Sequence, residues 1–478
     1  MSTTWSTYQE NIFAWADTIE RNLMVKAGAG CGKTTTIVEL YKRLQMKHPL
    51  SSVLFMAFNK KIADELGLRG VPASTMNSFG FKTVLKSHPR IKLETNKVRN
   101  LAKMVGVEYK KTNMVARTVS LLKAYLYPVD VTTNDIQNII MDFELSEEKI
   151  GTLDVDKIKE VFRRSLEDFN QIDFDDQICY PVYHNMSVPK SDFVIIDEAQ
   201  DLSPNKLELV SRAVGKRFVC VGDPLQAIYG FCGADSESMD KIQAQFEPIV
   251  LSLPVTYRCG KRIVEEAHKR GVAPSDFQAG PDNHEGEVLN QSYAAFENSV
   301  QPKDFVLCRV TAPLVSGCFS LIKKGTRAQI LGRDVGKKLE QLVDKISKNE
   351  PMTMVVFCEE MNNYCQREVA KLRAAMKDTQ ADNLEDQIDC LHVFTEGTPD
   401  IGSMKNKINL MFDDSVNPHS VTFSTIHKAK GLEADNVYCL PYKSRPAKKE
   451  RQKQEEKNLL YVQITRAKNR LVWVKEAC

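Results

Sequence analysis

The chain has 478 residues, of which 42% are hydrophobic and 27% are charged, with 65 Lys and Arg against 62 Asp and Glu. This length exceeds one ordinary domain, and the composition is typical of a globular protein with two or more lobes. No run of 18 apolar residues and no charged-then-apolar leader occurs, which argues against a membrane span or a signal peptide. The 12 cysteines form no CxxC pair and no zinc-spaced cluster, so we expect reduced, packed thiols.

A phosphate-binding loop is predicted near the N-terminus. The apolar residues 23–25 lead into AGAGCGKTTT (27–36), and an amphipathic run follows. In this strand–loop–helix order, glycine N–H groups close around phosphate oxygens at the positive end of a helix. Lys33 would reach the β- and γ-phosphates, and the Thr34 hydroxyl would bind Mg²⁺. The residues expected around the phosphates are Ala27, Gly28, Ala29, Gly30, Cys31, Gly32, Lys33, Thr34 and Thr35, although the strict pattern has glycine at position 27.

Charge is unevenly distributed over the next part of the chain. Residues 81–123, the basic block, hold eleven Lys and Arg against two Glu, whereas residues 124–176 hold fourteen Asp and Glu against five Lys and Arg. A concentrated basic stripe favours a phosphate-binding face. A solvated helix surface is the alternative.

Acidic residues follow a second apolar run, in SDFVIIDEAQD (191–201). Asp197 would hold Mg²⁺, and Glu198 would orient and deprotonate an attacking water. The segment VGDPLQAIYGFCGA (221–234) then places Gln226 ahead of Tyr229 and Phe231. An amide can sense a phosphate and aromatic faces can hold bases, whereas ordinary core packing is the alternative for the two rings.

Two arginines could supply positive charge to a γ-phosphate. Arg258 lies in LPVTYRC (253–259) and Arg466 in NLLYVQITRAKNRL (458–471). Arginine fingers matter by roughly 10³–10⁵ in rate where they act. Taken alone, either arginine would more often form a surface ion pair.

These segments together resemble superfamily 1A helicases of the UvrD/Rep type, in that family's order from Gln9 to Arg466. Tyr8-Gln9 resembles the adenine-reading motif, LFMAFNKKIADEL (54–66) motif Ia, STMNSFG (74–80) motif Ib and TFSTIHKAKGLEADNVY (422–438) motif V. VIIDEAQD, VGDPLQAIYGFCGA, LPVTYRC and NLLYVQITRAKNRL look like motifs II, III, IV and VI. The phrase AFNKKIA is most similar to the F-box DNA helicase branch and to compact phage relatives.

The resemblance implies roles for individual residues. Gln9 would read the edge of adenine, Tyr257 would stack on its ring, Glu433 would bind the ribose and Gln226 would contact the γ-phosphate. Residues expected at single-stranded DNA are Phe58, Asn77, Tyr229, Phe231, Thr425 and His427. The chain departs from the family at Asn77, Cys232 and Thr256, where histidine, arginine and asparagine are usual.

We therefore expect an α/β fold of two RecA-like P-loop lobes with parallel sheets, each carrying an inserted, mainly helical subdomain. The first lobe would comprise 1–80 and 178–250, with 81–177 inserted. The second would comprise 251–344 and 416–478, with a reduced insertion at 345–415. The basic segment 443–453 is rich in breakers and is expected to form a flexible loop, or a loop that touches DNA.

The expected function is ATP- and Mg²⁺-dependent translocation on single-stranded DNA, 3′ to 5′, with unwinding of tailed duplexes in replication, recombination or repair. A translocase that strips proteins from single strands without unwinding is the alternative, and a non-catalytic adaptor or an RNA helicase fits less well. Expected partners are single-stranded and tailed duplex DNA, with single-strand-binding or recombination proteins as further candidates. We expect a monomer or weak oligomer, cytoplasmic in a bacterial or phage-infected cell and nuclear in a eukaryote.

Overall fold

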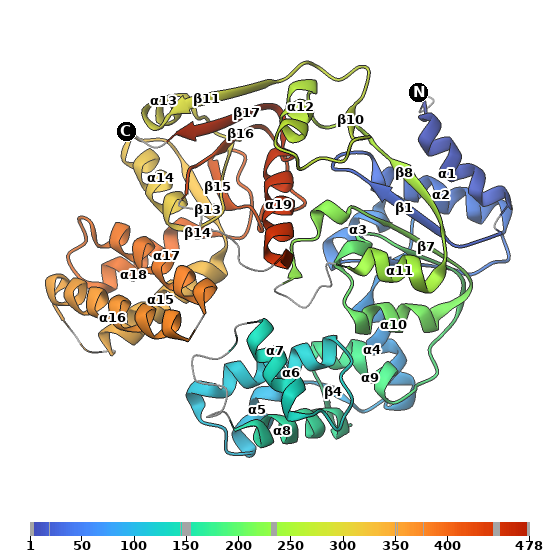
Figure 1. Ribbon diagram of the computed structural model, residues 1–478, viewed down its shortest axis with the longest axis horizontal. Coiled ribbons are helices and arrows are strands. Elements are labelled where there is room, and N and C mark those ends of the chain that lie inside the picture. The colour runs from blue at the N-terminus through green and yellow to red at the C-terminus, as the bar shows by residue number, and fades with distance from the viewer. Residues whose placement is uncertain are drawn as a thin grey trace. The chain divides into compact units, whose positions relative to one another are not determined.

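The computed structural model describes residues 4–18, 20–143, 145, 154–230, 237–348, 350, 352–375, 377–442 and 450–475. The chain divides into two compact units, Met1–Val255 and Thr256–Cys478. Each unit contains a parallel sheet with helices beside it (Figure 1). Within the described ranges, no helix combines the length and the apolar character that crossing a bilayer requires.

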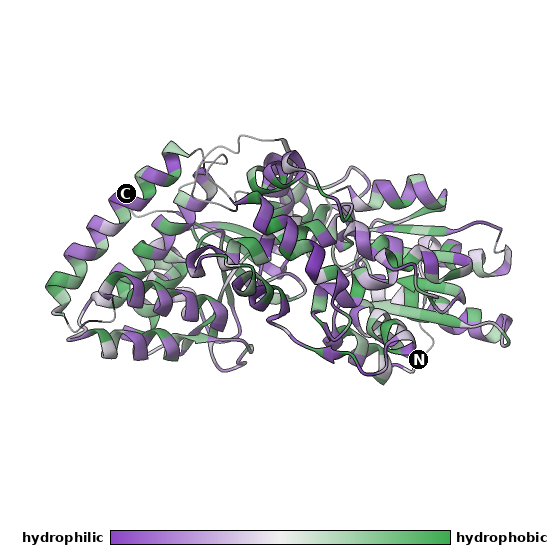
Figure 2. Cartoon of the chain, turned by 90° about the horizontal axis from the view of Figure 1, so that it is seen from below, coloured by the Kyte–Doolittle hydropathy of each residue, from purple (hydrophilic) through white to green (hydrophobic). Residues whose placement is uncertain are grey.

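The sheet of the first unit has six strands in the order β3-β2-β6-β7-β1-β8. Its strands are β1 (Leu23–Ala27), β2 (Val53–Ala57), β3 (Ala73–Thr75), β6 (Ser191–Ile196), β7 (Val214–Gly222) and β8 (Ile249–Leu253). All neighbouring pairs run parallel. The central strands are continuous apolar runs because helices cover both faces of such a sheet. Strands are accordingly mostly hydrophobic in Figure 2, whereas the helices mix both kinds of residue.

The helices that belong to this sheet are α1 (Thr7–Thr18), α2 (Lys33–Lys47), α3 (Lys60–Leu68), α10 (Pro204–Ala213) and α11 (Ser238–Phe246). Short 3₁₀ turns η3 (Ala199–Asp201) and η4 (Pro224–Gln226) follow β6 and β7. Since parallel strands end at one edge of the sheet, the loops after β1, β6 and β7 lie at the same edge.

A helical insertion lies between β3 and β6. It comprises α4 (Met76–Ser87), α5 (Lys97–Met104), η1 (Tyr109–Lys111), α6 (Thr112–Ala124), α7 (Thr133–Asp142), α8 (Val155–Glu167) and α9 (Phe174–Tyr183), with a two-stranded ribbon of β4 (Lys92–Leu93) and β5 (Gln171–Ile172). Most of its buried residues form a cluster of their own, apart from Met76, Phe79 and Ile178, which belong to the cluster of the sheet. Helix α4 packs against α9 so closely that a Cβ at Gly80 would lie 1.9 Å from the Gln177 carbonyl oxygen.

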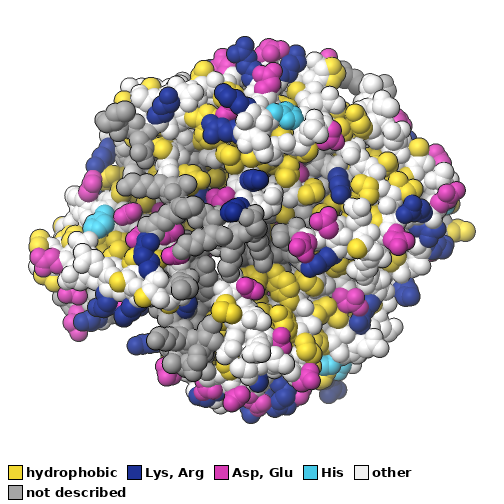
Figure 3. All heavy atoms as spheres, in the orientation of Figure 1, with side chains coloured by type: hydrophobic (Ala, Val, Ile, Leu, Met, Phe, Trp, Pro, Cys, Tyr) yellow, Lys and Arg dark blue, Asp and Glu magenta, His cyan; other side chains and the backbone are white. Residues whose placement is uncertain are grey.

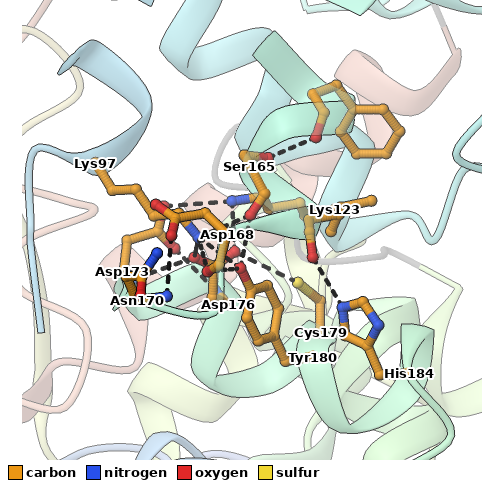
Figure 4. Close-up of polar contacts among 12 residues, drawn as sticks. Lys97, Lys123, Ser165, Asp168, Asn170, Asp173, Asp176, Cys179, Tyr180 and His184 are labelled. Atoms are coloured by element: carbon orange, nitrogen blue, oxygen red, sulfur yellow. Dashed lines mark hydrogen bonds and ion pairs between the residues drawn. The ribbon is translucent and has the colours of Figure 1, made fainter. Parts of the chain in front are cut away.

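The basic block in this insertion is not one continuous surface. Seven of its eleven basic side chains are exposed, but Lys97 and Lys123 are fully buried. Their ammonium groups pair with Asp176, at 2.8 and 2.6 Å, in the interior of the insertion (Figure 4). Lys97 and Lys123 therefore cannot belong to the predicted phosphate-binding face, because they pair with carboxylates inside the insertion. The prediction stays open for the exposed part of the block. On the face seen in Figure 3, acidic side chains also stand among the basic ones.

The second unit holds seven parallel strands in the order β11-β17-β16-β12-β15-β13-β14. They are β11 (Glu287–Ser292), β12 (Phe305–Cys308), β13 (Ala328–Leu331), β14 (Phe412–Asp413), β15 (Val421–Thr425), β16 (Ala434–Cys439) and β17 (Ala467–Lys475). A small ribbon of β9 (Val255–Thr256) and β10 (Gln278–Ala279) precedes them. Helices α12 (Lys261–Lys269), α13 (Tyr293–Ser299), α14 (Ala312–Lys323), α15 (Arg333–Ser347) and α19 (Glu450–Ile464) accompany the sheet.

Three further helices form the second insertion, namely α16 (Met354–Ala374), α17 (Asp378–Thr395) and α18 (Ile401–Met411). Unlike the first insertion, they share one core with the sheet. Phe357 of α16 and Leu391 of α17 belong to the same buried cluster as Phe423 of β15. The α/β fold with parallel sheets and helical insertions is thus confirmed. The boundaries that we assigned to the lobes and insertions stay a prediction.

Candidate active site

The phosphate-binding loop lies between β1 and α2. Gly30 and Gly32 have φ angles of 70° and 77°, in the left-handed region that glycine adopts without strain. Gly32 is the N-cap of α2, which leaves Lys33 and Thr34 in the first turn of that helix. The N-terminal N–H groups of such a helix are suited to a bound anion.

Two carboxylates lie beside this helix terminus. Asp197 and Glu198 directly follow β6, and Asp197 is only 2% exposed. The Thr34 hydroxyl oxygen lies 3.5 Å from Asp197 Oδ2, and Lys33 Nζ lies 3.7 Å from Glu198 Oε1. Residues 163 positions apart therefore meet because β1 and β6 end at the same sheet edge.

The electrostatics of this cluster suit a site that binds cations and phosphates. Burial, followed by the charge of Glu198, raises the pKa of Asp197 to about 7. Burial opposes the charge of Lys33, but Glu198, Asp223 and Asp197 outweigh it and raise the pKa of the ammonium. Mg²⁺ binds oxygen ligands such as hydroxyls and carboxylates together with phosphate oxygens. Thr34 and Asp197 supply such a pair, so these residues fit the ion.

Gln9 is engaged at both ends of its amide. Ser6, just before α1, donates its backbone N–H and its hydroxyl to Gln9 Oε1 at 3.0 and 3.2 Å. The Gln9 backbone N–H donates to Ser6 Oγ. Gln9 Nε2 donates to Thr36 Oγ1 at 2.9 Å, and Thr36 donates to the Gly32 carbonyl at 2.9 Å. Gln9 therefore ties α1 to the phosphate-binding loop, and its expected contact with adenine stays a prediction.

Gln226 and Tyr229 follow β7 along one short segment. Gln226 is buried and donates to Asp223 Oδ2 at 2.7 Å. Tyr229 stacks on Phe58, with ring centroids 6.2 Å apart and planes inclined by 6°. The Lys206 ammonium lies 5.5 Å from the centre of the Phe58 ring. Phe231 and Cys232 lie outside the described residues, as do positions 443–449 of the predicted loop.

Asn77, in the first turn of α4, is hydrogen-bonded to α9. Its amide nitrogen donates to the Phe174 carbonyl at 2.8 Å and to Gln177 Oε1 at 3.1 Å. Both amide hydrogens are therefore used on α9. The amide oxygen of Asn77 is therefore the part of the amide left for the predicted contact with DNA.

In the second unit, the predicted residues Arg258 and Glu433 form an ion pair, and Lys468 joins them. Arg258 Nε lies 2.5 Å and Lys468 Nζ 2.7 Å from the Glu433 oxygens. Burial opposes the charge of Glu433, but Lys468 and Arg258 outweigh it and lower its pKa. Tyr257 is 51% exposed, which leaves a ring face open to a ligand.

Arg466 is 1% exposed, which is unusual for an arginine. It donates to the carbonyls of Val462, at 3.2 Å, and Leu432, at 3.0 Å. Burial, followed by the charge of Arg258, lowers the pKa of Arg466 to about 10, so it stays protonated at neutral pH. Whether Arg258 and Arg466 act on a γ-phosphate stays a prediction.

Thr425 is the last residue of β15, and His427 follows two positions later. The Lys428 N–H faces Thr425 Oγ1 at 3.4 Å, and His427 Nε2 lies 4.0 Å from Glu455 Oε1. Burial, followed by the charge of Arg309, lowers the pKa of His427 to about 3. His427 is thus a neutral imidazole at physiological pH.

Three residues of these clusters had no assigned role in the sequence analysis. Gln200 and Asp223 lie within the DEAQD and VGDP segments, and Lys468 lies two residues after Arg466. Gln200 and Asp223 are polar residues within the same motifs as the predicted site residues Glu198 and Gln226. Their place in these motifs was the available signal, but their burial and their partners follow only from the fold.

A phosphate-binding loop that faces two carboxylates across one edge of a parallel sheet defines a P-loop protein. More specifically, the chain belongs to the UvrD/REP helicase family. Residues 7–247 match the UvrD/REP helicase N-terminal domain, and residues 420–474 match the UvrD-like helicase C-terminal domain. The resemblance drawn from the motifs is thereby confirmed.

Several curated proteins are similar to the chain. F-box DNA helicase protein 1 of Schizosaccharomyces pombe is 25% identical over 94% of this chain and 55% of the relative. ATP-dependent DNA helicase Rep of Escherichia coli is 24% identical over 59% of this chain and 49% of the relative. ATP-dependent DNA helicase PcrA of Staphylococcus epidermidis is 26% identical over 53% of this chain and 38% of the relative. The chain thus spans about half the length of the curated relatives it matches.

Proposed function

We propose that the chain is an ATP- and Mg²⁺-dependent motor that moves 3′ to 5′ along single-stranded DNA and unwinds tailed duplexes. The observation that carries this proposal is the meeting of Lys33 and Thr34 with Glu198 and Asp197 at one sheet edge. The names of the relatives, which are ATP-dependent and F-box DNA helicases, support the same reaction and substrate.

The chemistry assigned to the site follows from its groups. Lys33 and the N–H groups at the start of α2 would hold the β- and γ-phosphates. Thr34 and Asp197 would hold Mg²⁺, which when bound neutralises charge on the phosphates. Glu198 would take the proton of the attacking water. In this proposal Arg258 and Arg466 stabilise the charge of the transition state, and Tyr257, Glu433 and Gln9 hold the nucleoside.

The proposed DNA contacts use aromatic faces. Base–aromatic stacking contributes about 1–3 kcal/mol per base and accepts any base, which suits a motor that must pass every sequence. Tyr229 and Phe58 are already parallel to each other, and Thr425 and His427 are the proposed contacts of the second unit. The exposed part of the basic block would bind phosphates.

The test is ATP hydrolysis with and without single-stranded DNA, followed by strand displacement on 3′- and 5′-tailed duplexes. Lys33→Ala should lower hydrolysis by about 100-fold or more, since one donor to developing charge is removed, while the protein stays folded. Lys42→Ala, at an exposed position of the same helix, is the matched control and should keep wild-type hydrolysis. A fully active Lys33→Ala variant would refute the site.

Strand displacement separates the two functions that share this site. Displacement only from 3′-tailed duplexes is the expected result. DNA-stimulated hydrolysis with no displacement would favour the protein-stripping translocase instead. We expect partners to include single-stranded DNA and recombination or single-strand-binding proteins, and the chain to act as a monomer or weak oligomer in the cytoplasm or nucleus.

A further inference from the structure

A loop of the second unit, residues 280–286, lies against the segment 256–262 that carries the proposed adenine contact. The loop follows β10, and the segment ends in the first turn of α12. The Arg262 N–H donates to a carbonyl of the loop at 2.8 Å. A Cβ at Gly260 would lie only 2.8 Å from Gly286 Cα. The two backbones are therefore in direct contact, and a change in the loop acts on the segment.

One side chain of the loop bonds the segment on both sides of Tyr257 and Arg258. Asn283 Nδ2 lies 2.8 Å from the Thr256 carbonyl oxygen and 2.8 Å from the Cys259 carbonyl oxygen. Since a carbonyl only accepts, the NH₂ group of the amide must face both oxygens, and each of its hydrogens is used. A single amide thus fixes the distance between the carbonyls that precede and follow the two residues.

Gly280 leaves room for this amide and for the Tyr257 ring. Its N–H donates to the Thr256 carbonyl at 2.9 Å. A Cβ at Gly280 would lie 2.8 Å from Asn283 Oδ1 and 3.4 Å from Tyr257 Cδ1. The ring therefore lies beside the backbone of the loop, while about half of the Tyr257 side chain, 51%, stays exposed.

Of the two residues between these carbonyls, Tyr257 depends more on the amide. The Arg258 side chain is held separately, by Glu433 at 2.5 Å and by the Thr465 carbonyl at 3.5 Å. Among the residues that the structure describes, the Tyr257 side chain makes no hydrogen bond or ion pair of its own. The direction of its ring is thus set by the backbone on either side of it, which Asn283 holds.

We propose that Asn283 is a positioning residue for recognition of the nucleotide base, because it holds the Tyr257 ring in the orientation that stacks on adenine. This role rests on the proposed function and deepens it, since it concerns the base of ATP and not its phosphates. A ring that is held in its bound orientation before the ligand arrives binds more tightly, because less freedom is lost on binding. Every contact named for this role lies within the second unit.

The test compares two competitive inhibitors of ATP hydrolysis, ADP, which has a base, and tripolyphosphate, which has none. Full loss of a base–aromatic stack corresponds to roughly 5- to 150-fold in affinity. We expect Asn283→Ala to raise the Ki of ADP and the KM of ATP about 5- to 20-fold, with the Ki of tripolyphosphate and kcat within about threefold of wild type. Asn290→Ala, at an exposed position of β11, is the matched control and should keep all four values.

Two further variants cover the case in which Asn283→Ala does not fold. Gly280→Ala keeps every polar group, but its methyl group must displace the Asn283 amide, so the Ki of ADP should rise in the same direction. Tyr257→Ala removes the ring itself. Once the ring is absent, adding Asn283→Ala should leave the Ki of ADP unchanged, because two residues that act through one contact are not additive.

The outcomes separate this role from the motor. If wild-type protein does not hydrolyse ATP, the proposed function fails. If wild-type protein is active but Tyr257→Ala leaves the Ki of ADP unchanged, the ring does not stack on the base and the role of Asn283 is overturned while the motor stands. If Asn283→Ala and Gly280→Ala change the Ki of ADP and of tripolyphosphate equally, or if Asn283→Ala adds to Tyr257→Ala, Asn283 is only structural and the proposed role is overturned.

Discussion

The buried ion-pair network of the first insertion offers a direct test of how this subdomain is stabilised. Asp176, at the start of α9, is fully buried between two lysines. Its Oδ2 accepts from Lys97 at 2.8 Å and from the Asp173 N–H at 3.1 Å, and its Oδ1 accepts from Lys123 at 2.6 Å. Burial opposes the charge of Lys123, but Asp176 and Asp173 outweigh it and raise its pKa well above the ordinary value.

The perturbation is Asp176→Asn, which keeps the shape and removes the charge. An asparagine has one oxygen and one NH₂ group, so in either orientation the NH₂ group must face a lysine ammonium. Lys123 would keep Asp173 at 3.3 Å. Lys97 would keep only neutral acceptors, namely the Ser165 carbonyl at 2.7 Å, the Tyr180 hydroxyl at 2.6 Å and the Asp168 carbonyl at 3.4 Å. Removing one partner of a buried pair costs about 3–5 kcal/mol of stability.

The assay is hydrogen exchange of the backbone amides of α5 and α6, together with urea unfolding followed by circular dichroism. A loss of 3–5 kcal/mol corresponds to roughly 10²–10⁴-fold faster exchange in these helices, where exchange reports the opening of this subdomain. Glu160→Gln is the control, because Glu160 pairs with Arg163 and Arg164 at a partly exposed position and its loss should leave exchange in α5 and α6 near the wild-type rate. An Asp176→Asn variant within about 1 kcal/mol of wild type would refute the reasoning.

Three further predictions concern the proposed ligands. Replacing the exposed Lys82, Lys86 and Lys92 with glutamine should reduce the slope of log affinity for single-stranded DNA against log salt by about 0.7 for each phosphate that is no longer neutralised. Lys269→Gln, exposed in the second unit, is the control, and an unchanged slope in the triple variant would favour a merely solvated surface. Because burial and Glu198 raise the pKa of Asp197 to about 7 and only the ionised carboxylate binds Mg²⁺, the Mg²⁺ concentration for half-maximal hydrolysis should fall about fivefold from pH 6 to pH 7 and little above that. A value that does not vary with pH would contradict this role of Asp197. Because the pKa of His427 is lowered to about 3, His427→Gln should leave the salt slope unchanged between pH 6 and pH 8, and a smaller slope would show that the histidine binds as a cation.

Local patterns were sufficient to predict much of the fold. The strand, phosphate-binding loop and helix near the N-terminus and the apolar run before Asp197 follow from glycine positions and from the pattern of hydrophobic residues. Such signals lie within a few residues of the element they predict. They therefore do not depend on where the rest of the chain goes.

Charge patterns were less informative, because a lysine has the same local sequence signature on a surface and in an ion pair. Lys97 lies 79 residues from Asp176, and Lys123 lies 53 residues from it. Only the packing of α5, α6 and α9 brings these groups together. The same reason explains the shared core of the second insertion, since Phe357 and Phe423 belong to one buried cluster although they lie 66 positions apart in sequence.

The candidate active site, like the fold, was predicted only in part from the sequence. The residue types in AGAGCGKTTT and DEAQD were enough to predict phosphate, Mg²⁺ and water chemistry, because each type carries its chemistry with it. The sheet decided that Thr34 and Asp197 meet, that Gln9 is tied to Thr36 and that Gln200 joins Glu198 to Asp223. Sequence alone determined which groups are present, whereas strand order and burial determined which of them touch and what charge they carry. Pairing and desolvation depend on distances in space, which only the tertiary structure sets.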